Sequence, residues 1–203
     1  MEPIRELLNL IFPSCCAVCE RIGADLCQEH VAALNPTTFE FQRGQLKGFA
    51  AVHYSEEVSK ALSSFKEKGQ LALAKEFARM MRDALRQFSA FPGLLVPAPS
   101  RPENFRKRGY QPALSLAREL SGSWQVCDAL RFDRQVRDQV GLDERRRSEN
   151  ISGSMRVWIP VQGKSCLIVD DVVTSGATVL EANRALTKAG AQVVGVLALA
   201  ATS

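Results

Sequence analysis

Two adjacent carboxylates followed by small hydroxyl side chains are the clearest chemical signal in this 203-residue chain. An apolar run from Lys164 to Val169 leads into Asp170 and Asp171, and a helical pattern begins after Gly176. Small residues let the backbone wrap around an anion, and the following helix adds the positive end of its dipole. We therefore predict a phosphate-binding segment made of Asp170, Asp171, Val172, Val173, Thr174, Ser175, Gly176, Ala177 and Thr178.

The two carboxylates of this segment would repel a phosphate, so we expect them to accept hydrogen bonds from neutral hydroxyls of the same ligand. The 2′- and 3′-hydroxyls of ribose fit, which makes a ribose 5-phosphate the predicted ligand. The alternative is that Asp170 and Asp171 only end a buried strand and that the next residues cap a helix. The segment lacks the Gly-Lys-Ser/Thr of a nucleoside-triphosphatase loop, which argues against an ATPase.

Four potential metal ligands crowd the first 30 residues of the chain. A CxxC pair is followed by a CxxH pair, which suits a closed, structural tetrahedral zinc site. Cys15 could replace Cys16 in a CxxxC pair, His30 could be an ordinary surface histidine, and an iron–sulfur cluster is the minority alternative. The predicted ligands are Cys16, Cys19, Cys27 and His30.

Positive charge gathers in the segment from Arg101 to Tyr110, which carries four cations and one acid. This segment suits the phosphate backbone of single-stranded nucleic acid, with Phe105 and Tyr110 available for stacking. A second cluster, Arg145 to Arg147, lies next to two acidic residues and is equally consistent with a solvated charged turn. Net charge alone is weak evidence, because +4 spread over a whole surface favours anionic partners only slightly.

No apolar run approaches the roughly 20 residues that a membrane-spanning helix needs. Ile4, Leu7, Leu8 and Ile11 follow helical spacing, and acidic residues interrupt what would otherwise be a signal peptide. We therefore expect a short amphipathic helix that is kept in the mature protein. A cytoplasmic location and free thiols follow from the same pattern.

The elements that would position these groups alternate between strand-like and helical runs, which predicts an α/β fold. The strand-like runs are apolar on both faces, as in a parallel sheet covered by helices. They are Gly48–Tyr54, Leu94–Val96, Trp124–Cys127, Cys166–Val169 and Gln192–Leu199. Helices are expected at Glu56–Lys66, Leu71–Phe88, Gln111–Leu120 and Ala177–Ala189, the last closed by Gly190. Ser100–Tyr110 and Arg131–Ser154 are interpreted as functional loops.

The chain is expected to divide into two parts. Residues 1–34 are too short and too rich in cysteine to follow the logic of the rest, and they form a small zinc-binding module. Residues 35–203 form the α/β domain that carries the phosphate segment.

Taken together, these motifs resemble the ComF family, whose members are described as competence or amidophosphoribosyltransferase-like proteins. The resemblance spans nearly the whole chain and includes five ordered motifs. They are the cysteine pairs after Phe12-Pro13, Val96–Pro99, Phe105–Ala113, Gln139–Gly153 and the phosphate segment. The chain departs from the usual pattern at His30, at Tyr110-Gln111-Pro112, at Ser175 and at Met155.

The resemblance implies a type I phosphoribosyltransferase fold that binds phosphoribosyl diphosphate together with Mg²⁺. It implies a diphosphate loop at Pro97–Arg101 and a mobile loop at Arg137–Asn150 that closes over the reaction. Asp170, Asp171 and Arg145 would then be the catalytic residues. Contacts with the diphosphate would come from Pro99, Ser100, Arg101, Arg106, Lys107 and Arg108.

Two functions remain open at this point. The first is transfer of the phosphoribosyl group to a nitrogen nucleophile, although no separate hood for an acceptor base can be identified. The second is a non-catalytic accessory protein in DNA uptake that binds single-stranded DNA or competence proteins. Both use the same phosphate segment, and fold alone does not decide between them.

Overall fold

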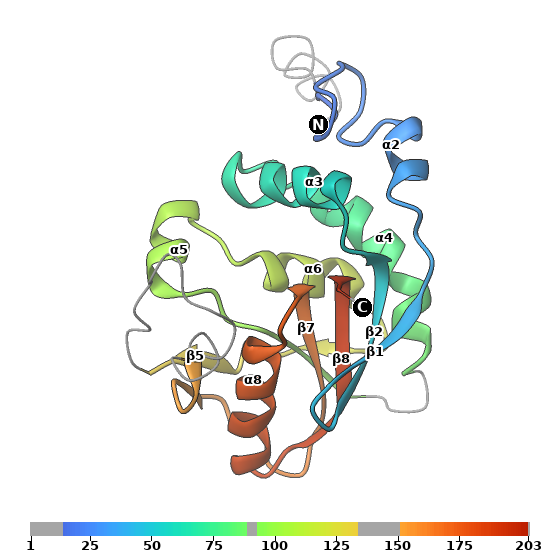
Figure 1. Ribbon diagram of the computed structural model, residues 1–203. Helices are drawn as coiled ribbons and strands as arrows, with labels where there is room; N and C mark the ends of the chain where they lie inside the picture. The colour runs from blue at the N-terminus through green and yellow to red at the C-terminus, as the bar shows by residue number, and fades with distance from the viewer. Residues whose placement is uncertain (1–13, 89–92, 134–150, 203) are drawn as a thin grey trace.

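The chain folds around a twisted sheet, shown in Figure 1, and the computed structural model describes residues 14–88, 93–133 and 151–202. The strand order is β1-β2-β8-β7-β3-β4, and every pair is parallel except β1 with β2. The strands are β1 (Phe39–Arg43), β2 (Leu46–His53), β3 (Leu94–Pro97), β4 (Gln125–Val126), β7 (Ser165–Val173) and β8 (Gln192–Ala201). The predicted α/β class with a mostly parallel sheet is confirmed.

Helices cover both faces of the sheet, so each face packs against its own apolar core (Figure 1). One face carries α3 (Glu56–Glu67), α4 (Leu73–Arg86) and α6 (Pro112–Leu120). The other face carries α8 (Ala177–Lys188) and a small antiparallel sheet of β5 (Leu130–Phe132) and β6 (Met155–Val157). The central strands β7 and β8 are buried on both sides, which explains their continuous apolar sequence.

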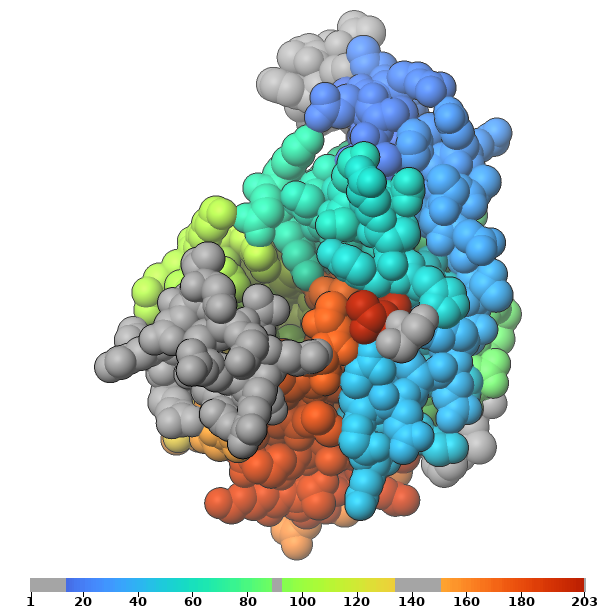
Figure 2. Space-filling model, in the orientation of Figure 1, coloured from blue at the N-terminus to red at the C-terminus, as the bar shows by residue number. Residues whose placement is uncertain are grey.

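The N-terminal module shares the core of one sheet face. Cys16, Ala17 and Leu26 are buried in the same apolar cluster as Phe65 of α3 and Phe77 of α4. Figure 2 shows the blue N-terminal residues resting on the teal surface of α3. The module contains the short helix α2 (Gln28–Ala33), which no sequence pattern had indicated. A domain boundary after Leu34 stays a prediction.

Two sequence interpretations are wrong in detail. Ser100–Tyr110 was expected to be a loop, but Pro102–Arg108 forms helix α5. The helix begins at a proline, whose fixed φ suits the first turn, and ends at Gly109 with φ 76°. The segment Arg131–Ser154 was also expected to be a loop, yet its first two residues belong to β5. Hydrogen bonding to β6 creates that strand, and the local sequence gave no sign of its partner.

Several further expectations concern residues outside the described ranges. The N-terminal amphipathic helix falls there, as does the whole predicted mobile loop, Arg137–Asn150, with Arg145. Within the described ranges, no helix is both long enough and apolar enough to cross a membrane. A cytoplasmic location stays a prediction.

Candidate functional site

A cavity of about 280 Å³ lies at the carboxyl ends of β3 and β7, where parallel α/β sheets commonly bind ligands. Five residues of the predicted phosphate segment line it: Asp170, Asp171, Val172, Thr174 and Thr178. Four of the predicted diphosphate contacts line it as well: Pro99, Ser100, Arg101 and Arg108. The cavity therefore joins two motifs that lie about 70 residues apart in the sequence.

The remaining predicted contacts lie elsewhere. Val173 is buried in the core on the α8 face, and Lys107 is an exposed side chain paired with Glu67 at 2.7 Å. Arg106 is exposed and does not line the cavity. Ser175, Gly176 and Ala177 form the turn into α8, where the Ser175 hydroxyl accepts a long hydrogen bond of 3.5 Å from the Ala177 N–H.

The turn into α8 depends on a glycine and on a neighbouring strand. Gly176 has φ 80°, and a Cβ atom placed there would lie 2.6 Å from Cγ of Arg43. Nε of Arg43 in β1 donates to the carbonyl oxygen of Thr174 at 2.6 Å. A terminal nitrogen of Arg43 donates to the carbonyl oxygen of Thr202 at 2.7 Å. The strand β1 was not predicted, although Phe39 and Phe41 alternate with polar residues in the pattern of a half-buried strand.

The two aspartates lie within β7, which continues to Val173 and does not end before them. Adjacent residues of a strand point to opposite faces of the sheet, so the two side chains occupy different environments. Asp171 is buried and pairs with Lys66 of α3 at 2.9 Å. The Asp171 N–H donates to Oδ1 of Asp170 at 2.9 Å. Desolvation and the charge of Asp171 raise the pKa of Asp170 to about 8, although Lys66 opposes the shift. The ionised form of Asp170 is therefore disfavoured unless a cation lies beside it.

Lys66 is a site residue that the sequence did not single out. It lines the cavity, and its side chain is only 21% exposed. The residue lies in an ordinary amphipathic helix with several exposed lysines, so its type and spacing gave no signal. Its position follows from the packing of α3 beside the carboxyl end of β7.

Arg108 of α5 also lines the cavity, and its guanidinium is partly satisfied. One terminal nitrogen donates to Glu67 at 2.6 Å, and its side chain is 14% exposed. Its Nε is buried and has no hydrogen-bond partner among the described residues. Burying such a donor without an acceptor costs about 1–3 kcal/mol.

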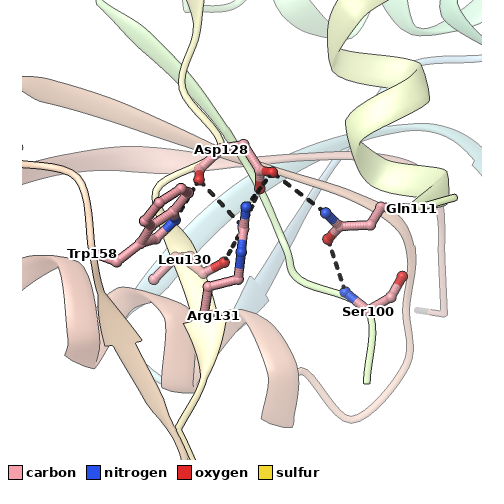
Figure 3. A network of polar contacts seen from close by, with 6 residues as sticks. All are labelled: Ser100, Gln111, Asp128, Leu130, Arg131 and Trp158. Atoms are coloured by element: carbon pink, nitrogen blue, oxygen red, sulfur yellow. Dashed lines mark hydrogen bonds and ion pairs between the residues drawn. The ribbon is translucent and has the colours of Figure 1, made fainter. Parts of the chain in front are cut away.

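The predicted diphosphate loop, Pro97–Arg101, is held by a polar network, shown in Figure 3. The Ser100 N–H donates to Oε1 of Gln111 at 3.3 Å, and Nε2 of Gln111 donates to Oδ2 of Asp128 at 3.4 Å. Arg131 then forms a two-point ion pair with the Asp128 carboxylate. Gln111 lies in a segment where the chain departs from the ComF pattern, and here it braces the loop.

The four predicted zinc ligands converge in the N-terminal module, and their ligand atoms all lie within 4.8 Å of one another. Sγ of Cys27 lies 3.0 Å from Nδ1 of His30, and Sγ of Cys19 lies 4.0 Å from Sγ of Cys27. Tetrahedral zinc with bonds of about 2.0–2.3 Å needs ligand atoms about 3.3–3.8 Å apart. The group therefore fits zinc, and it selects Cys16 over Cys15.

The electrostatics of Cys16 also favour metal binding. Burial opposes ionisation, but backbone N–H groups of the surrounding knuckles outweigh it and lower the pKa of the thiol to about 6. Zinc binds the thiolate form, so this environment suits a metal ligand.

Comparisons with known proteins now identify the class that the fold and site define. Residues 106–203 match the phosphoribosyl transferase domain family. The chain is 35% identical to the DNA utilization protein YhgH of Escherichia coli over 115 residues, which is 55% of this chain and 50% of the relative. The chain thus matches about half the length of that protein.

Two competence proteins match more of the chain. The competence protein ComFC of Streptococcus pneumoniae is 24% identical over 91% of this chain and 84% of its own length. Competence protein F of Haemophilus influenzae is 27% identical over 73% of this chain and 69% of its own. This protein therefore carries a phosphoribosyl transferase domain and is a homologue of the ComF competence proteins, as the sequence motifs predicted.

Among solved structures, an adenine phosphoribosyltransferase is similar, with 14% identity and a TM-score of 0.42. The match covers 86% of this chain and 90% of that one.

Proposed function

We propose that the cavity binds phosphoribosyl diphosphate. Asp170 and Asp171 accept hydrogen bonds from the ribose hydroxyls, and the turn from Thr174 to Thr178 holds the 5-phosphate at the start of α8. The loop Pro99–Arg101 and the guanidinium of Arg108 hold the diphosphate. The observation that carries the proposal is that the carboxylate pair, the loop Pro99–Arg101 and Arg108 line one cavity.

The same site suits Mg²⁺. Burial and the charge of Asp171 raise the pKa of Asp170, so a cation beside it would favour the ionised carboxylate, and carboxylate oxygens are ligands that Mg²⁺ accepts. When bound with the diphosphate, the ion would offset the negative charge that develops on the leaving group.

The proposed reaction is transfer of the phosphoribosyl group to a nitrogen nucleophile. The bond from C1 to the diphosphate oxygen breaks, a bond from C1 to nitrogen forms, and the diphosphate leaves with the bonding electron pair. Asp170 and Asp171 orient the ribose and stabilise the positive charge that develops on its ring. Arg108 and Arg101 stabilise the departing diphosphate, and Arg145 stays a predicted contributor from outside the described residues.

A second candidate is a non-catalytic accessory protein in DNA uptake. The relatives named for competence and DNA utilization favour it. In that case phosphoribosyl diphosphate binds without being consumed, and single-stranded DNA or a competence protein is the working partner. The exposed cations and Phe105 of α5 supply a surface of the required charge.

Release of diphosphate separates the two candidates. The protein is incubated with Mg²⁺ and phosphoribosyl diphosphate, alone and with each nucleobase or with single-stranded DNA. An enzyme releases diphosphate faster when the right acceptor is present. Binding of phosphoribosyl diphosphate without acceptor-dependent release would support the accessory role and contradict the transfer reaction.

We also propose that the Cys16, Cys19, Cys27 and His30 group holds a structural zinc ion. The four ligands leave no open position for water, so the metal would stabilise the module and take no part in chemistry.

A further inference from the structure

An exposed aromatic–cation pair, Trp158 and Arg131, belongs to the polar network of Figure 3, which reaches the cavity at Ser100. Trp158, which follows β6, is 57% exposed, and the guanidinium carbon of Arg131 in β5 lies 4.7 Å from its ring centroid. Most of a large apolar ring is therefore in contact with water, which is unfavourable unless something covers it.

The polar edges of both side chains are already occupied. The two terminal nitrogens of Arg131 donate to the two carboxylate oxygens of Asp128 at 2.6 and 2.7 Å. The first of them also donates to the Leu130 carbonyl oxygen at 2.7 Å. The indole N–H of Trp158 donates to the Asp128 carbonyl oxygen at 2.8 Å. The pair therefore offers a ligand a flat π surface that carries little uncompensated charge.

Such a surface suits a flat, neutral heterocycle better than a phosphate. A phosphate would compete with the Asp128 carboxylate, which offsets the guanidinium charge and accepts one N–H from each terminal nitrogen. A nucleobase needs only a ring face or a guanidinium plane, because every base has a π face.

The pair is also fixed relative to the phosphate cavity. Asp128 links it through Gln111 to the N–H of Ser100, which lines the cavity. Phe132, the residue after Arg131, lines the cavity too. A ligand that carries both a phosphate and a base could therefore meet two rigidly connected sites.

We propose that Trp158 and Arg131 form a stacking platform for a purine or pyrimidine base. The platform is separate from the cavity proposed for phosphoribosyl diphosphate. The base comes either from a free acceptor or from a single strand of nucleic acid, and both sources share the chemistry that the platform recognises.

Tryptophan fluorescence tests the platform directly, because the chain has two tryptophans and Trp124 is buried at 5% exposure. In a Trp124→Phe variant, Trp158 is the sole reporter. Adenine, a ten-residue oligo(dA) and an abasic strand of the same length are titrated separately. We expect adenine or oligo(dA) to quench Trp158, and the abasic strand to leave its emission unchanged. Quenching by adenine indicates a free base, and quenching by oligo(dA) alone indicates a base within a strand.

Variants at the platform give a second, independent measurement. Fluorescence anisotropy of a labelled oligo(dA), or equilibrium dialysis of adenine, reports affinity without using tryptophan. Trp158→Ala is expected to weaken binding about tenfold, the scale of one base stacked on one aromatic ring. Trp158→Phe keeps a ring and should recover most of that affinity. Arg131→Lys loses the flat guanidinium and should also weaken binding.

Three results would overturn the proposal: no quenching by either base-bearing probe at millimolar concentration, equal quenching by the abasic strand, or unchanged affinity in Trp158→Ala. All arms are run without phosphoribosyl diphosphate. Failure of the platform is therefore distinguishable from failure of the proposed phosphate site, which its own titration tests.

Discussion

At the scale of single residues, the site is defined by how its charges are compensated. Asp171 has Lys66 as its partner, whereas Asp170 is desolvated and shares no ion pair that the structure shows among the described residues. Arg108 contributes a buried donor with no partner in that part of the chain. The uncompensated groups of Asp170 and Arg108 suit a ligand that supplies hydroxyls, phosphates and a cation.

Removing the Lys66 ammonium should weaken both the fold and the site. Lys66→Met leaves Asp171 as an unpaired carboxylate that is 9% exposed, and losing one partner of such a pair costs about 3 kcal/mol. Lys68→Met is the matched control, because Lys68 lies two residues away and pairs with Glu20 on the surface. That surface pair is worth little.

Urea unfolding of the two variants measures the difference, and Lys66→Arg shows whether charge alone restores stability. Equal destabilisation by Lys66→Met and Lys68→Met would contradict the role given to the buried pair.

The raised pKa of Asp170 predicts a pH dependence of stability. Its pKa is about 8 in the folded protein and near 3.8 without the fold. Between these values the folded protein binds more protons than the unfolded chain, so the free energy of unfolding falls as pH rises from about 4 to about 8. Asp170→Asn removes this contribution. Urea unfolding at several pH values, without divalent cations, should show a smaller decline for the variant, and parallel curves would count against the shift.

At the scale of elements, the sequence predicted what depends on local pattern and missed what depends on a distant partner. The five strands and four helices with strong apolar patterns were all found, and Gly190 closes α8 with φ 80°. Helix α5 was missed because its seven residues are too polar for an apolar stripe, despite the proline at its start. β5 is a strand only because β6 lies opposite.

The residues of the candidate site also divide into those that a local pattern predicted and those that depend on a distant partner. The convergence of Cys16, Cys19, Cys27 and His30, and the position of Asp170 and Asp171 at a cavity, were predictable because residue types and spacing are themselves the signal. Lys66 and Arg43 were not, because packing of α3 and β1 brings them to the segment from more than 100 residues away.

The turn that opens α8 should be sensitive to a single methyl group. Gly176→Ala forces φ 80° on a residue with a Cβ, which costs about 1–2 kcal/mol, and it also displaces Arg43 from Thr174. Gly109→Ala is the control, since Gly109 has φ 76° and nothing within 4 Å of its Cβ position.

Thermal unfolding should show that Gly176→Ala lowers the free energy of unfolding by about 1 kcal/mol more than Gly109→Ala does, which is the scale of a lost hydrogen bond. Equal losses would mean that Arg43 does not hold the turn.

At the scale of the whole molecule, the N-terminal module and the phosphate cavity meet at α3. The Ser64 hydroxyl donates to the Ala17 carbonyl oxygen at 2.9 Å, and Nε2 of Gln70 donates to the Cys15 carbonyl oxygen at 2.6 Å. Lys66, which reaches Asp171, lies between those two contacts in the sequence. The module therefore supports the helix that brings the cation to the site.

Removal of zinc should therefore destabilise the entire chain. Metal analysis of the purified protein is expected to find a single zinc ion, lost in Cys16→Ser and kept in the neighbouring control Cys15→Ser. A chelator should lower the melting temperature of the wild type, because loss of the metal unfolds the module and exposes the core it shares with α3 and α4. A metal-free wild type, or a melting temperature unchanged by the chelator, would contradict this expectation.

The central claim is that the cavity at the carboxyl ends of β3 and β7 binds phosphoribosyl diphosphate through its carboxylate pair. Isothermal titration calorimetry with Mg²⁺ tests it most directly, comparing the wild type with an Asp170→Asn, Asp171→Asn double variant whose fold is verified by circular dichroism. We expect saturable binding to the wild type and at least a tenfold loss of affinity in the variant, because ribose hydroxyls and the cation lose their acceptors. Equal affinity in the two proteins, or no binding to the wild type, would contradict the assignment of the site.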